Sequence, residues 1–97
     1  MPAKIKVTQS AEGHFDVRVI EGFSQTSHRV TLKEDDYVRL TQGKIEPREL
    51  VRLSFEFLLD HEPKESVLSQ FDLSVIRRYF PQFDREITRR ISQPGTK

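Results

Sequence analysis

The stretch that decides the fold is residues 4–21, KIKVTQSAEGHFDVRVIE. Apolar and polar residues alternate on both sides of a turn that contains Gly13. The alternating apolar residues are Ile5, Val7, Phe15, Val17 and Val19. Period-two alternation puts every second side chain on one face of a strand, and glycine tolerates the positive φ of a tight turn. The pattern predicts a β-hairpin with strands at about 4–9 and 14–21.

A third alternating run follows at residues 27–31, after a polar segment expected to form a loop. His28 and Val30 fall on one face of this run, and Ser27, Arg29 and Thr31 fall on the other. We expect a third strand beside the second, and therefore a three-stranded antiparallel sheet.

After this run the apolar spacing becomes helical. Thr31 and Glu34 have the spacing of a capping box, which predicts a helix at about 32–41 that ends near Gly43. Further helices are expected at about 47–61, 72–80 and 82–91, with Pro47 at a first helical position and Pro81 as a break. The fold class is therefore α+β, a sheet followed by four helices.

The composition is that of one small folded domain. The chain has 97 residues, of which 35% are hydrophobic and 32% charged, and its seven Phe residues supply large apolar surfaces for a core. We assign residues 1–91 to the domain. The Pro-Gly-containing tail, residues 92–97, is expected to be disordered.

The helix at 47–61 is apolar around most of its circumference. Its polar stripe consists of Glu49, Arg52, Glu56 and Asp60. Such a helix is either central in its own domain or covered by a partner, which includes a second copy of the chain. In the helix at 72–80, Tyr79 and Phe80 are expected to anchor the end in the core, just before Pro81.

The sequence carries no recognisable catalytic or metal-binding pattern. It has no cysteine for a disulfide or a thiolate metal site, no closely spaced histidine pair, no phosphate-binding glycine loop and no nucleophile motif. We therefore expect a protein that is not an enzyme and that uses no cofactor and no metal. No apolar run approaches the ~18 residues of a membrane span, and no signal peptide is evident, so we expect a cytoplasmic protein.

The formal net charge is +1, but the C-terminal quarter is basic, with six Lys or Arg residues against three Asp or Glu. Arg78, Arg85 and Arg89 would line one face if the last two helices packed side by side. This face would contact phosphates or an acidic protein. Alternatively, it is a solvated surface partly paired with Asp84 and Glu86.

Residues 27–61 resemble the ribbon-helix-helix family. The segment HRVTL at 28–32 is followed by an acid-started helix, a glycine-containing turn and an apolar helix. The resemblance implies that the strand pairs across a dimer and reads the DNA major groove, with Phe57 and Leu58 in the dimer core. The base-reading side chains would be Ser27, Arg29 and Thr31.

The segment FDLSVIRRYFP at 71–81, together with the preceding helix, looks like a group of short uncharacterised bacterial proteins. This resemblance implies a bacterial cytoplasmic origin and supplies no activity.

The leading hypothesis from the sequence is a small non-enzymatic protein-interaction module that binds a partner, or itself, through the helix at 47–61. The alternative is a nucleic-acid-binding protein that uses the ribbon-like strand or the C-terminal arginines.

Overall fold

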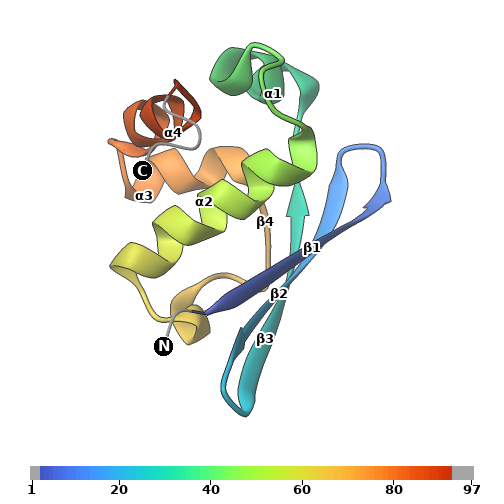
Figure 1. Ribbon diagram of the computed structural model, residues 1–97, viewed down its shortest axis with the longest axis vertical. Coiled ribbons are helices and arrows are strands. Elements are labelled where there is room, and N and C mark those ends of the chain that lie inside the picture. The colour runs from blue at the N-terminus through green and yellow to red at the C-terminus, as the bar shows by residue number, and fades with distance from the viewer. Residues whose placement is uncertain (1–2, 93–97) are drawn as a thin grey trace.

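A four-stranded mixed sheet with helices packed on one face makes up the small α+β domain seen in the computed structural model (Figure 1). The structure describes residues 3–92. In spatial order the strands are β1 (Lys4–Ala11), β2 (His14–Glu21), β3 (Ser24–Thr31) and β4 (Gln70–Asp72). The helices are α1 (Glu34–Thr41), α2 (Pro47–His61), α3 (Ile76–Tyr79) and α4 (Phe83–Ser92).

The first three strands form an antiparallel meander, as the alternation predicts. Gly13 has φ +76° in the β1–β2 turn, and its carbonyl accepts a hydrogen bond from the Leu32 amide at 2.9 Å. Gly22, with φ +60°, begins the two-residue β2–β3 turn, where glycine is the favoured residue. On the inner face of the sheet four apolar side chains are almost fully buried: Phe15, Val17, Val19 and Val30.

The predicted three-stranded sheet is wrong in two respects. β3 begins at Ser24 and not at 27, because the polar segment after the turn continues the pairing with β2. A fourth strand, β4, adds parallel to β3, with Val30 opposite Phe71. This pairing joins segments about forty residues apart in the chain, so no local sequence pattern predicts it.

His28 anchors the approach to β4. Its side chain is buried, and Nδ1 lies 2.7 Å from the Leu68 carbonyl oxygen while Nε2 lies 2.8 Å from the Thr26 hydroxyl. A carbonyl oxygen only accepts hydrogen bonds, so Nδ1 is the donor and Nε2 accepts from Thr26. The Arg29 amide donates to the Ser69 carbonyl at 2.7 Å. Together these bonds hold the chain in position to enter β4.

The capping box at Thr31 and the helix start at 32 are also wrong. α1 begins at Glu34, and Lys33 in the capping position makes no side-chain hydrogen bond. The Thr31 hydroxyl instead donates to Asp72 Oδ1 at 2.7 Å across β3 and β4. A tertiary partner has therefore replaced the local one.

The predicted helix at 72–80 is broken into shorter pieces. Asp72 is the last residue of β4, and its Oδ2 accepts hydrogen bonds from the Ser74 amide (3.0 Å) and hydroxyl (2.6 Å). A 3₁₀ turn, η2 (Leu73–Val75), follows before α3 begins at Ile76. Partial burial raises the pKa of Asp72, but the hydrogen bonds from Ser74 and Thr31 outweigh this effect and lower it below its usual range.

α2 is the central helix of its own domain. It crosses the sheet diagonally, and α3 and α4 lie on its other side (Figure 1). Six of its residues are buried: Leu50, Val51, Ser54, Phe55, Phe57 and Leu58. The Phe55 ring lies between His28 (5.3 Å between centroids) and Phe71 (6.0 Å), and Phe57 contacts Phe83 (5.3 Å). Packing within the chain thus accounts for the wide apolar surface of this helix.

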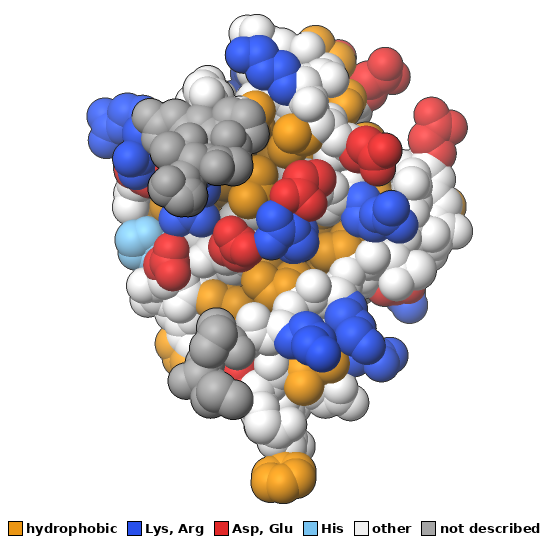
Figure 2. All heavy atoms as spheres, in the orientation of Figure 1, with side chains coloured by type: hydrophobic (Ala, Val, Ile, Leu, Met, Phe, Trp, Pro, Cys, Tyr) orange, Lys and Arg blue, Asp and Glu red, His pale blue; other side chains and the backbone are white. Residues whose placement is uncertain are grey.

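The remaining surface of α2 is charged and internally paired. Arg52 forms ion pairs with Glu49 and Glu56, and Arg90 of α4 reaches Asp60 at 3.0 Å. Figure 2 shows acidic and basic side chains interspersed on the face that carries α2, with hydrophobic side chains between them.

One lysine is buried where the chain leaves α2. Lys64, in the 3₁₀ turn η1 (Lys64–Ser66), is 3% exposed, and its Nζ donates to Glu65 at 2.7 Å and to Glu21 at 3.0 Å. These hydrogen bonds raise the pKa of Lys64. They also tie the far end of the β2–β3 hairpin to the turn after α2.

The predicted disordered tail at 92–97 lies almost wholly outside the described residues, and its first residue is helical. α4 ends at Ser92, so of the predicted tail only this residue is described, and residues 93–97 lie outside the described part. None of the helices within residues 3–92 has the length and apolar character needed to cross a membrane.

Candidate interaction surfaces

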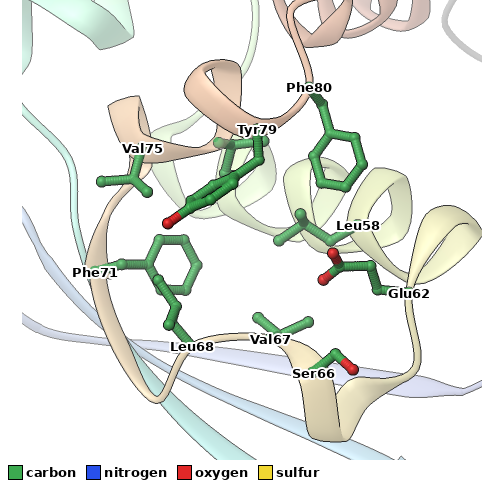
Figure 3. A pocket seen from close by; sticks show the side chains of 10 residues that line it. Leu58, Glu62, Ser66, Val67, Leu68, Phe71, Val75, Tyr79 and Phe80 are labelled. Carbon is green, nitrogen blue, oxygen red and sulfur yellow. The ribbon is translucent and has the colours of Figure 1, made fainter.

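An apolar groove opens between the end of α2, the segment leading into β4, and α3 (Figure 3). Its volume is about 230 Å³. Leu58, Phe71, Val75 and Phe80 supply apolar walls, and Leu68 and Tyr79 lie at the opening from opposite sides. We call this the apolar groove.

The local backbone explains why Leu68 is on the surface. Val67, directly after η1, has an extended backbone conformation, so its side chain and that of Leu68 point to opposite sides. Val67 is buried at 9% exposure, while Leu68 next to it is 50% exposed. The backbone carbonyl of Leu68 accepts a hydrogen bond from His28. This bond fixes the backbone from which the exposed Leu68 side chain projects.

Tyr79 departs from the sequence prediction. It is the last residue of α3, and Phe80 after it leaves the helical conformation with φ −131° and ψ 87°. Phe80 turns toward His61 and Phe57, with ring centroids 5.1 and 5.7 Å away, and is partly buried. Tyr79 stays outside at 68% exposure, so the expectation that it anchors the helix in the core is wrong.

The polar groups of the apolar groove are few. Glu62 is the one charged residue among those that line it, and its carboxylate is directed toward the interior in Figure 3. The ion pairs formed within residues 3–92 do not involve Glu62. The hydroxyls of Ser66 and Tyr79 add hydrogen-bonding capacity. The arrangement suits an apolar ligand that carries a cation at one end.

A second, polar surface is the face of the sheet opposite the helices, which we call the open sheet face. It is hollowed over a volume of about 480 Å³. Two of the predicted base-reading residues, Ser27 and Arg29, line this hollow, together with Lys6, Arg18 and Gln70. The third, Thr31, lies on the same face, with its hydroxyl bonded to Asp72.

Lys6 and Arg18 are not among the binding residues predicted from the sequence. Their place on the polar side of the hairpin follows from the alternation, and their cross-strand pairing follows from the turn position. The sequence pattern therefore contained the information needed to place both cations side by side on this face. β3 itself is hydrogen-bonded to β2 along its whole length and to β4 over its last three residues.

The C-terminal arginines are distributed over two helices and are partly neutralised. Arg78 lies on α3, while Arg85 and Arg89 lie one turn apart on α4, and all three are exposed. Arg89 pairs with Glu86 at 2.6 Å, and this hydrogen bond lowers the pKa of Glu86. Arg77 reaches Asp84 at 3.7 Å, so its charge too is shared with a carboxylate.

Within residues 3–92, no three His, Asp or Glu side chains gather closely enough to hold a metal ion. The two strand histidines have separate environments, since His14 is exposed and His28 is buried and hydrogen-bonded.

No family model matches the chain, and neither a curated protein nor a solved structure shows significant similarity to it. No function can therefore be carried over from a relative. The apolar groove and the open sheet face are the two surfaces from which function can be inferred.

Proposed function

We propose that this protein is a small non-enzymatic interaction module that binds a segment of a partner protein in the apolar groove. One observation carries the proposal: among the described residues, four large hydrophobic side chains are exposed, and two of them, Leu68 and Tyr79, flank this groove.

Exposed apolar residues scattered singly are normal on protein surfaces. Here two of them border a hollow whose walls are core residues such as Phe71 and Leu58. A partner segment bound there would extend the hydrophobic core outward and remove the side chains of Leu68 and Tyr79 from water. Removing apolar surface from water is favourable in proportion to the area covered.

The size of the apolar groove points to a side chain and not to a cofactor. Pockets for small molecules usually have volumes of roughly 300–1,000 Å³. A volume of about 230 Å³ is smaller and suits one bulky apolar side chain.

The charge in the apolar groove indicates which residue of the partner lies beside its apolar anchor. Glu62 is the charged residue in the lining, so a Lys or Arg beside the apolar anchor would be attracted to it. The partner segment is therefore expected to combine a Leu-, Met- or Phe-like anchor with an adjacent basic residue.

Only the C-terminal end of α2 contacts the partner in this proposal. Partner binding along the whole helix at 47–61 is no longer needed to explain its apolar residues, because most of them are buried within the chain. Its C-terminal end still takes part, since Leu58 lines the apolar groove and Glu62 follows directly after the helix.

We also propose a cytoplasmic location and a bacterial origin. The absence of cysteine fits a reducing compartment, and the resemblance of residues 71–81 to short bacterial proteins supports the origin.

The test is selection of binders from a random peptide library displayed on phage. Peptides enriched on the parent protein should carry a bulky apolar residue next to Lys or Arg. Selection on Glu62→Gln should retain the apolar residue and lose the basic one. Enrichment of acidic or purely polar sequences, or the same basic preference on Glu62→Gln, would contradict the proposal.

A further inference from the structure

Four cations gather on the open sheet face: Lys4, Lys6, Arg18 and Arg29, all exposed. Two carboxylates of this face, Asp16 and Asp72, oppose these four cations, which leaves two positive charges in excess. Asp16 lies 3.5 Å from Arg29, and Asp72 accepts hydrogen bonds from Thr31 and Ser74. The face therefore carries an excess of positive charge, although the whole chain has a net charge of only +1.

Lys6 and Arg18 form the centre of this excess. They are direct cross-strand partners in the β1–β2 register, on the same face of the sheet. Like charges directly opposite each other destabilise a sheet. Within residues 3–92, neither side chain forms an ion pair that would relieve the repulsion. An anionic ligand would relieve it.

The cations follow the strands and are not gathered around one point. Register rows on one face lie about 6.8 Å apart along a strand, twice the rise per residue. Arg29, the Lys6–Arg18 pair and Lys4 occupy three successive rows. This spacing suits a ligand with charges repeated along a chain better than it suits a single phosphate.

The same line of rows leads to an unusual aromatic residue. Phe23, in the turn between β2 and β3, is fully exposed and packs on nothing in the core. The turn lies at the lower end of the molecule in Figure 1, beyond the helices. An exposed ring at the end of a basic stripe provides a stacking platform for a base, which an acidic peptide does not need.

We infer that the open sheet face binds single-stranded nucleic acid, with the phosphate backbone along Arg29, Arg18 and Lys6 and a base stacked on Phe23. Ser27 and Gln70 in the hollow hydrogen-bond to the backbone or the bases. Apart from Phe23, the exposed imidazole of His14 is the only aromatic ring among the described residues of this face, so sequence preference is expected to be weak.

The test is fluorescence anisotropy with a labelled mixed-sequence single-stranded DNA of about 12 nucleotides, within the usual range of site sizes. Titrations at about 50 and 200 mM salt give the salt dependence of binding. The double variant Lys6→Ala/Arg18→Ala should lose at least about tenfold in affinity, and its log–log salt slope should fall by about 1.4, since each lost phosphate contact removes about 0.7.

Two further variants sharpen the result. Phe23→Ser should weaken binding by about tenfold and leave the salt slope unchanged, because stacking releases no counterions. Arg85→Ala/Arg89→Ala removes the same charge from α4 and should bind like the parent. All five positions are exposed, so thermal melts should confirm that the variants remain folded.

Three outcomes would overturn the inference. One is absence of saturable binding by the parent at the lower salt. Another is an equal loss in the sheet and α4 double variants, which would show a diffuse charge effect. The third is stronger competition by a polyglutamate peptide than by unlabelled oligonucleotide, with Phe23→Ser unaffected, which would assign the face to an acidic protein segment.

Discussion

The two faces of the sheet differ in almost every physical property. Toward α2, Phe15, Val17 and Val30 are at most 1% exposed and form part of one apolar core. On the opposite face, Arg18 and Arg29 are exposed and surround a polar hollow. Consecutive residues of a single strand supply both faces, so stability and recognition can be changed separately by mutating neighbours.

The comparison also shows where a chain of this size can carry function. Most of its large apolar side chains are used in the core on the α2 side. The surface left for recognition is the open sheet face and the apolar groove at the margin of the core, where Leu68 and Tyr79 remain in water.

The largest expected effect is at Phe55, which is fully buried between His28 and Phe71. Phe55→Ala should lower the free energy of unfolding by about 3–5 kcal/mol, because it removes a buried ring and leaves a cavity. Denaturant unfolding measures the loss. Phe80→Ala is the matched comparison and should cost clearly less, since Phe80 is only partly buried. Equal losses would show that the partly buried Phe80 ring contributes as much to the core as the fully buried Phe55 ring.

A smaller effect is expected from neighbouring residues of β2. Val17→Ala should cost about 2 kcal/mol, from two buried carbon atoms at about 0.8 kcal/mol each plus a cavity contribution. Arg18→Ala should change stability by less than about 0.5 kcal/mol, as is usual at exposed sites. Thermal or denaturant unfolding of both variants tests the contrast between the faces. The contrast would be contradicted if Arg18→Ala lowered the free energy of unfolding as much as Val17→Ala does.

A third effect should depend on pH. Asp72 accepts from Thr31 with one carboxylate oxygen and from Ser74 with the other, and Asn keeps only one acceptor oxygen, so Asp72→Asn should cost about 1 kcal/mol near pH 7. Because folding lowers the pKa of Asp72, its contribution is complete above the unfolded value of 3.8 and disappears as the pH falls through the folded pKa. Unfolding curves of parent and variant should therefore converge below about pH 4. A constant difference down to pH 2 would contradict this role.

The smallest effect on stability is expected at the groove rim. Leu68→Ser and Tyr79→Ser should each shift the free energy of unfolding by less than about 0.5 kcal/mol, because both side chains are largely in water already. A large loss of stability in thermal unfolding would mean that Leu68 and Tyr79 support the fold, and would contradict their assignment to a binding surface.

Much of the fold follows from the sequence where the determining contacts are local. The hairpin around Gly13, the bounds of α2 and its charged stripe were all predictable, because alternation, helical periodicity and Pro47 act within a few residues. β4 was not, since it has three residues and depends on pairing with a strand about forty residues away. The same long-range pairing took Thr31 from its expected capping role, because its hydroxyl bonds Asp72 instead.

The candidate surfaces were predictable only in part. Ser27 and Arg29 were placed on the polar side of β3, which the structure confirms, but the apolar groove was missed. It arises because Phe80 leaves the helical conformation and because the backbone is extended at Val67. Pro81 predicts the end of the helix, but no sequence pattern predicts that Phe80 turns inward while Tyr79 stays outside. Tyr79 and Leu68 were therefore not recognised as neighbours across an opening.

The most direct test of the central claim is the affinity of a groove-selected peptide for two matched variants. Leu68→Ser/Tyr79→Ser removes both rims of the apolar groove, whereas Val38→Ser removes an equally exposed apolar side chain from α1, outside it. Isothermal titration calorimetry should show at least about a tenfold weaker affinity for the double variant and an unchanged affinity for Val38→Ser, as expected for anchors at the centre of an interface. Equal affinities for the parent and both variants would contradict the account, because the peptide would then bind elsewhere on the protein.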